Sequence, residues 1–216
     1  MRRHQAIIVF MVFVLGAGFA AVQADSEMAM RQDNEHVRRW NAFAQNALQL
    51  HGKLIARQGV SKKSSVGGYA HLPDYYREDR YYNKATGKLV SRLRWNRNKA
   101  DELHTIEVFL YDDKNRVIRD FSAAYLPHYR NAPNQTLISL HAYNNGTHAF
   151  RSFDATGYHI LDRCEGKLAG KEVNILLDED ELEQAQGAKG GIMQSQEYKT
   201  CTRGLPEGPG KYLKPQ

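Results

Sequence analysis

Between residues 37 and 55, apolar side chains recur at steps of three and four, and polar side chains fill the remaining positions. This spacing matches the period of an α-helix that buries one side. The residues at 33–35, Asp-Asn-Glu, supply capping side chains before the pattern, and Gly59 follows it. The pattern predicts one long amphipathic helix of about six turns. Its apolar side consists of Val37, Trp40, Phe43, Ala44, Ala47, Leu48, Leu54 and Ile55.

From about Tyr75 onward the apolar positions alternate with polar ones instead. Alternating runs cover residues 89–95, 105–110, 117–126, 136–143, 148–153, 158–164 and 172–177, and turn signals such as Asn144-Asn145-Gly146 separate them. The gaps are too short for crossover helices, so the strands must be antiparallel neighbours. The predicted fold class is therefore α+β: the long N-terminal amphipathic helix packs on an extended antiparallel β-meander sheet.

The first 24 residues have the three zones of an export signal. Arg2 and Arg3 form a basic start, residues 6–15 are apolar, and Val22 and Ala24 are small enough for cleavage after Ala24. The apolar run is shorter than the roughly 20 residues of a spanning helix. We expect cleavage and a periplasmic or secreted protein without a membrane span. The alternative is a segment retained as an anchor.

The remaining chain divides by composition into three further segments. After the signal peptide at 1–24, residues 25–68 are predicted to hold the helix and a polar linker. Residues 69–203 are predicted to form the β-meander domain. Residues 204–216 contain three prolines and three glycines, so we expect a flexible tail.

The only cysteines are Cys164 and Cys201. In an oxidising compartment, an isolated pair in a small domain usually forms a disulfide. Closing this loop would stabilise the fold by about 4 kcal/mol in the chain-entropy treatment. We predict one structural disulfide.

Composition fits a globular protein, because 42% of the 216 residues are hydrophobic and 25% are charged. The net charge is +6 at pH 7, and removal of Arg2 and Arg3 with the signal peptide makes the mature chain only mildly basic. Together with export, this modest charge disfavours nucleic acid as a partner.

Basic and aromatic residues concentrate in one segment, between residues 69 and 99. Arginine and tyrosine are enriched in protein interfaces, because they bury large planar groups at little entropic cost. We therefore predict a binding surface for a partner protein or an envelope complex. Its residues are Tyr75, Tyr76, Arg77, Arg80, Tyr81, Tyr82, Arg92, Arg94 and Arg97. The alternative is a solvated sheet face that prevents edge pairing.

Histidines offer a weaker indication of a metal site. His141 and His148 flank the turn at 144–146, so a hairpin would let them face each other. With a third ligand from His128 or His159, such a pair could hold copper or zinc. The alternative is that these histidines are ordinary strand residues, and no cofactor is required.

No short catalytic motif is present: the chain lacks GxSxG, HExxH, CxxC and GxxxxGK. The sequence therefore predicts no catalytic residues and favours a non-catalytic protein, although folding could assemble a site from distant positions. The leading hypothesis is an exported accessory or subunit-like protein. The alternatives are a periplasmic carrier of a small ligand or lipid and, third, a metal-dependent or hydrolytic enzyme.

Overall fold

The computed structural model describes residues 35–57, 59–127, 131–187 and 190–216. The predicted signal peptide and His128 lie outside the described residues. Within that part of the chain, no helix is both long and apolar enough to cross a membrane.

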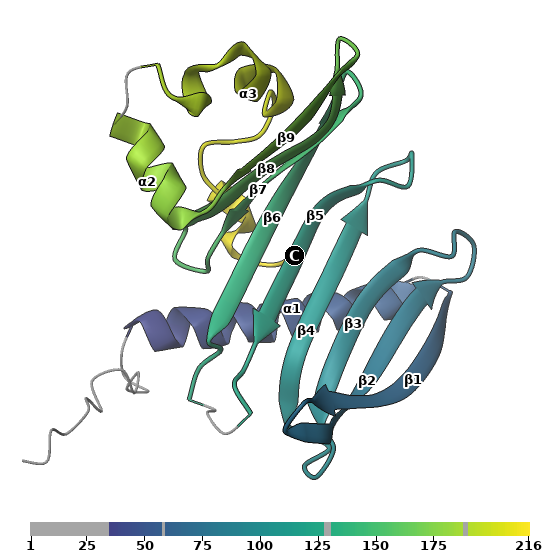
Figure 1. The fold of residues 1–216 in the computed structure, drawn as a ribbon. Helices are drawn as coiled ribbons and strands as arrows, with labels where there is room; N and C mark the ends of the chain where they lie inside the picture. Colours follow the sequence, from purple (N-terminus) through teal and green to yellow (C-terminus); the bar gives the residue numbers. More distant parts are fainter. Residues whose placement is uncertain (1–34, 58, 128–130, 188–189) are drawn as a thin grey trace, which may run out of the picture.

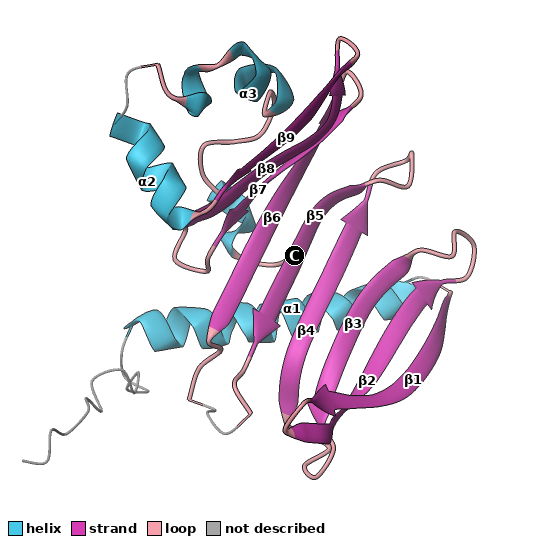
Figure 2. Cartoon of the chain, in the orientation of Figure 1, coloured by secondary structure: helices cyan, strands magenta, loops and turns pink. Residues whose placement is uncertain are grey.

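One antiparallel sheet of nine strands dominates the molecule (Figures 1 and 2). Its strands are β1 (Val60–Tyr69), β2 (Leu72–Asn83), β3 (Leu89–Asn96), β4 (Leu103–Tyr111), β5 (Val117–Ala124), β6 (Gln135–Asn144), β7 (Thr147–Phe153), β8 (His159–Leu168) and β9 (Lys171–Leu177). Each strand pairs with its neighbours in the sequence, from β1 at one edge to β9 at the other. The predicted antiparallel meander is confirmed.

Helix α1 (Glu35–Arg57) crosses strands β3 to β6 on one side of the sheet (Figure 1). Its apolar stripe is buried because Trp40, Phe43 and Ala47 pack against alternate residues of the strands, such as Phe121 and Ile138. The rings of Phe43 and Phe121 meet edge to face with their centroids 6.1 Å apart. This contact forms the centre of the hydrophobic core.

The register divides the sheet into two faces. Leu93, Ile106 and Phe121 point toward α1, and we call this the helix-side face. The residues between them, such as Arg92 and Glu107, point the other way, and we call this the helix-free face. Figure 1 views the molecule from the helix-free face, with α1 behind the strands.

The C-terminal region also packs on the helix-side face. It contains α2 (Glu179–Gly187), the 3₁₀ turn η2 (Ile192–Gln194), α3 (Gln196–Cys201) and the 3₁₀ turn η3 (Gly210–Leu213). A disulfide joins Cys164 of β8 to Cys201 of α3, as predicted. Leu182 of α2 and Tyr198 of α3 are buried against Leu177 at the end of β9.

Two segments differ in structure from what the sequence predicts. The expected linker ends at residue 68, but Val60–Tyr69 forms the edge strand β1. This strand pairs on one side only and is largely exposed, so the hydrophobic alternation that reveals a strand is absent from it. In the expected tail, Leu205 and Tyr212 pack on the core, and the guanidinium carbon of Arg119 lies 4.1 Å from the Tyr212 ring centre.

Candidate functional site

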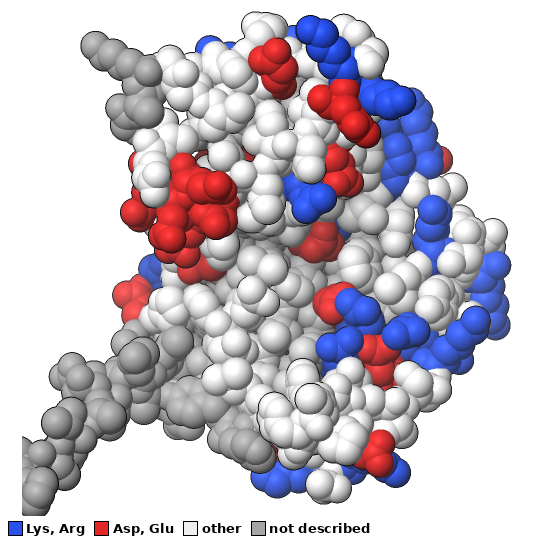
Figure 3. Space-filling model, in the orientation of Figure 1, with Lys and Arg blue, Asp and Glu red and all other residues white. Residues whose placement is uncertain are grey.

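The arginine- and tyrosine-rich segment lies on β2 and β3, but the register divides it between the two faces. Residues of the helix-free face are Tyr76, Arg80, Tyr82, Arg92 and Arg94. Tyr75, Arg77 and Tyr81 belong to the helix-side face, and Arg97 follows the end of β3. Figure 3 shows Lys and Arg along the side of the molecule opposite the acidic helix α2, both over β1–β3 and toward the tip of the β8–β9 hairpin. We call the helix-free group the arginine–tyrosine face.

Two carboxylates hold the arginines of this face. Glu78 forms ion pairs with Arg80 and Arg94, with 2.7 Å between Arg94 Nε and the Glu78 carboxylate. Glu107 accepts a hydrogen bond of 2.6 Å from Arg92. Burial alone would raise the pKa of Glu78, but the hydrogen bond from Arg94 and the charges of the neighbouring arginines lower the pKa below its ordinary value. Glu78 is therefore ionised.

The aromatic rings of the arginine–tyrosine face are held in place by cations. The Arg94 guanidinium carbon lies 4.6 Å from the centre of the Tyr76 ring. On the neighbouring edge strand, Lys63 Nζ lies 5.4 Å from the centre of the Tyr82 ring. These cation–π contacts fix the orientation of side chains that would otherwise be mobile. The result is a pre-ordered surface with mixed charge rather than a purely cationic one.

The three residues on the helix-side face serve packing and local ion pairing. Tyr81 contacts the ring of His51 on α1, and the Tyr75 hydroxyl donates a 2.7 Å hydrogen bond to the carbonyl of Pro127. Arg77 forms an ion pair with the buried Asp79. The structure therefore separates these three residues from the arginine–tyrosine face.

A second polar group lies further along the helix-free face, where the structure brings His141 and His148 together. His141 Nδ1 and His148 Nε2 are 2.9 Å apart, and His141 Nε2 lies 2.7 Å from a carboxylate oxygen of Asp120. Glu165 lies on the other side of His148. Burial lowers the pKa of His148, His141 lowers it further, and Glu165 opposes both.

The other predicted metal ligands do not join this pair. His159 lies on the helix-side face, where its Nε2 is 2.8 Å from the buried Asp162. His128 falls outside the described residues. Among the residues described, no three His, Cys, Asp or Glu side chains are grouped to hold a metal ion.

Asp120 and Glu165 are polar partners that sequence reasoning missed. They come from β5 and β8, and only the strand register places them beside the histidines of β6 and β7. The alternation of β5 already shows which of its residues share a face, so a correct register for the predicted hairpins would have located Asp120.

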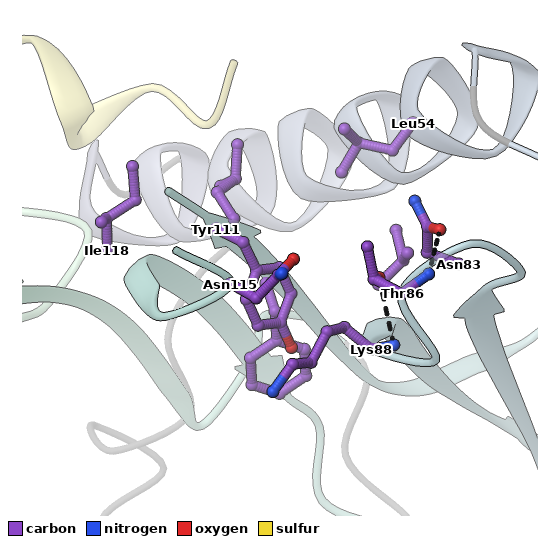
Figure 4. A pocket seen from close by; sticks show the side chains of 10 residues that line it. Leu54, Asn83, Thr86, Lys88, Tyr111, Asn115 and Ile118 are labelled. Carbon is purple, nitrogen blue, oxygen red and sulfur yellow. Dashed lines mark hydrogen bonds between the residues drawn. The ribbon is translucent and has the colours of Figure 1, made fainter. Parts of the chain in front are cut away.

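A cavity of about 200 Å³ lies between the C-terminal turns of α1 and two hairpin tips (Figure 4). Leu54 and Ile118 contribute apolar walls. Its polar groups are used locally: Asn83 Oδ1 accepts from the backbone of its own turn, and the Tyr111 hydroxyl donates to the carbonyl of Leu89. These bonds are those of turn-forming residues, so this cavity offers little chemistry.

The arrangement thus provides two separate capacities on the helix-free face. The arginine–tyrosine face can donate hydrogen bonds and bury planar groups, whereas the histidine pair can accept or transfer a proton. Comparisons of this chain with family models, with curated proteins and with solved structures find no match.

Proposed function

We propose that this chain is an exported, non-catalytic accessory protein that docks onto a partner protein through the arginine–tyrosine face. The observation that carries the proposal is that Arg80, Arg92 and Arg94 are pre-ordered by two carboxylates while their side chains keep 44%, 30% and 24% exposure. Pre-ordered side chains lose little conformational entropy on binding, which favours affinity.

The ion pairs also support a protein as the class of partner. A surface for a polyanion presents unpaired cations, because its affinity comes mainly from charge neutralisation. Here Glu78 and Glu107 neutralise part of the arginine charge. The remaining N–H donors and the rings of Tyr76 and Tyr82 suit a protein surface that contains both carbonyl groups and apolar side chains.

The filled core supports docking over transport of an enclosed ligand. Trp40 and Phe43 of α1 meet Phe121 and Phe153 of the sheet, so side chains occupy the space between the helix and the strands. Recognition on the outer face of the sheet therefore agrees better with this packing than a carrier with an internal cavity.

The docking test uses the double variant Arg80→Gln/Tyr82→Ala. Arg94 is left in place because the buried Glu78 would otherwise lose its main hydrogen-bond donor. We expect proteins that co-purify with the tagged wild-type chain from its native envelope extract to be depleted at least about tenfold, which corresponds to about 1.4 kcal/mol. Quantitative mass spectrometry measures the depletion.

The matched control is Arg39→Gln, which removes an exposed arginine from α1. It should capture the same proteins as the wild type. Equal capture by the double variant, with unchanged thermal stability of all three proteins, would contradict docking through the arginine–tyrosine face.

A further inference from the structure

Four side chains form a line across strands β5 to β8 on the helix-free face: Asp120, His141, His148 and Glu165. Asp120 lies 2.7 Å from His141 Nε2, and His141 Nδ1 lies 2.9 Å from His148 Nε2. The two imidazole planes differ by only 6°, with ring centres 5.2 Å apart. Together with the short distance between the nitrogens, this places the rings nearly in one plane and joined through their edges.

This line fixes which nitrogen of each histidine carries the proton. An ionised carboxylate only accepts hydrogen bonds, so His141 Nε2 must donate to Asp120. In the neutral ring His141 Nδ1 is then an acceptor, and His148 Nε2 must donate to it. The remaining lone pair of His148 is therefore on Nδ1.

The lone pair of His148 Nδ1 lies beside a second hydrogen-bond acceptor, the carboxylate of Glu165. Glu165 Oε1 lies 3.8 Å away, beyond hydrogen-bond distance. The second carboxylate oxygen, Oε2, is held by Arg163, whose Nη2 lies at 2.9 Å and Nε at 3.1 Å. In the neutral His148 ring, the acceptor atoms His148 Nδ1 and Glu165 Oε1 thus face each other without a proton between them.

Their spacing suits a metal ion. Bonds of about 2.0–2.2 Å from zinc to nitrogen and oxygen place two neighbouring ligand atoms about 3–4 Å apart. We propose that His148 Nδ1 and Glu165 Oε1 bind one divalent transition-metal ion of the zinc or copper class, with water completing its coordination. Imidazole favours these metals over calcium or magnesium.

The surroundings of His148 fit an exchangeable ion. Tyr143 lies against the His148 ring with centroids 4.6 Å apart, and Arg116 covers the Tyr143 ring with its guanidinium carbon 4.4 Å from the ring centre. An open hollow of about 470 Å³ is lined by these residues and by Glu165, which leaves room for water ligands. The nearby cations of Arg116 and Arg163 oppose tight binding, so we expect a reversible site.

The other two residues of the line, Asp120 and His141, orient the His148 ligand and do not bind the metal themselves. A ligating histidine usually donates its other N–H to an acceptor that orients the ring, and loss of that acceptor weakens binding. In the tautomers assigned above, His141 accepts from His148 Nε2 across 2.9 Å, and Asp120 in turn orients His141. His141 is therefore a positioning residue, and His148 and Glu165 are the ligands.

The first test titrates the full chain with Zn²⁺ alone by isothermal titration calorimetry. We expect one zinc ion to bind per chain, and the affinity to fall more than tenfold in each of the variants His148→Gln and Glu165→Gln. The matched control is His71→Gln, which removes a histidine from the turn between β1 and β2 and should leave binding unchanged. Unchanged affinity in His148→Gln, in a variant with wild-type near-UV circular dichroism, would overturn the proposal.

The second test follows the positioning role of His141, first in the metal-free chain and then through zinc binding. Long-range ¹H–¹⁵N NMR spectra of the metal-free chain should show His148 Nδ1 unprotonated and Nε2 protonated. His141→Asn supplies an amide oxygen as acceptor and should keep both this state and zinc affinity. His141→Phe removes the acceptor and should weaken zinc binding about 10–100-fold. A protonated Nδ1 in the neutral wild-type ring, or equal zinc affinity in the Asn and Phe variants, contradicts the assigned roles.

Discussion

At the scale of single residues, Arg151 and Asp162 form a deeply buried ion pair. Arg151 Nε and Nη2 lie 2.8 and 2.9 Å from the two carboxylate oxygens, and the side chains keep 4% and 1% exposure. Burial alone would raise the pKa of Asp162, but hydrogen bonds from His159, Arg151 and Tyr198 lower it. The Tyr198 hydroxyl of α3 accepts a hydrogen bond from Arg151 and donates one to Asp162, so the pair joins the sheet to α3.

Replacing one partner of this pair should be costly. Arg151→Met leaves the Asp162 carboxylate buried without its cation, and we expect the free energy of unfolding to fall by about 3–5 kcal/mol. Urea denaturation at neutral pH measures the change.

The double variant Arg151→Met/Asp162→Leu separates the cost of an orphaned charge from the value of the pair. It removes both charges and should be more stable than the single variant. If the double variant is as unstable as Arg151→Met, the penalty does not come from the uncompensated carboxylate.

At the scale of elements, a buried polar contact helps to attach α1 to the sheet in addition to its apolar stripe. His51 is buried, and its Nδ1 lies 2.7 Å from Ser91 Oγ of β3. Burial lowers the pKa of His51 below its ordinary value of 6.5. The folded chain therefore holds this imidazole neutral at a pH where the unfolded chain already binds a proton.

The docking of α1 should therefore depend on pH. The unfolded chain binds more protons at His51 than the folded chain, so this contribution is intact above the unfolded pKa and is lost as the pH falls through the folded pKa. Between about pH 7.5 and about pH 5, the wild type should lose more unfolding free energy than His51→Gln. Guanidinium titrations at both pH values measure this difference, and identical losses in the two proteins would contradict the prediction.

The elements also show how far sequence reasoning reaches. Strands with a buried side, such as β4 with Ile106 and Val108, alternate and were predicted. Val60–Tyr69 was not, because an edge strand with polar side chains on both sides carries no such pattern. His141 and His148 were predicted to face each other, since only the turn of one hairpin separates them. Glu78 and Glu107 as partners of the arginines required the register between strands, which local patterns do not specify.

At the scale of the whole molecule, the backbone hydrogen bonds of the sheet are unevenly protected from solvent. The helix α1 covers β3 to β6, whereas β1 forms an edge with mostly exposed side chains. Backbone hydrogen bonds in the central strands break only when the core opens, while edge bonds can break locally.

Hydrogen exchange should follow this distribution. We expect amides of β4 and β5 to exchange slowest and those of β1 to exchange fastest among the strands, with protection at the centre close to the global free energy of unfolding. Exchange measured by mass spectrometry on peptides from each strand checks this order. Slower exchange in β1 than in β5 would show that the edge is protected by a contact other than its pairing with β2.

The match between strand order and chain order has a consequence for how the protein is made. Each new strand needs only the one synthesised just before it, so a chain that emerges from its N-terminus during synthesis can extend the sheet one hairpin at a time. Helix α1 emerges before the strands, yet the sheet surface on which it packs is complete only when β6 has been added. Until then its apolar stripe lacks a cover, and this interval is when a nascent chain would benefit most from a chaperone.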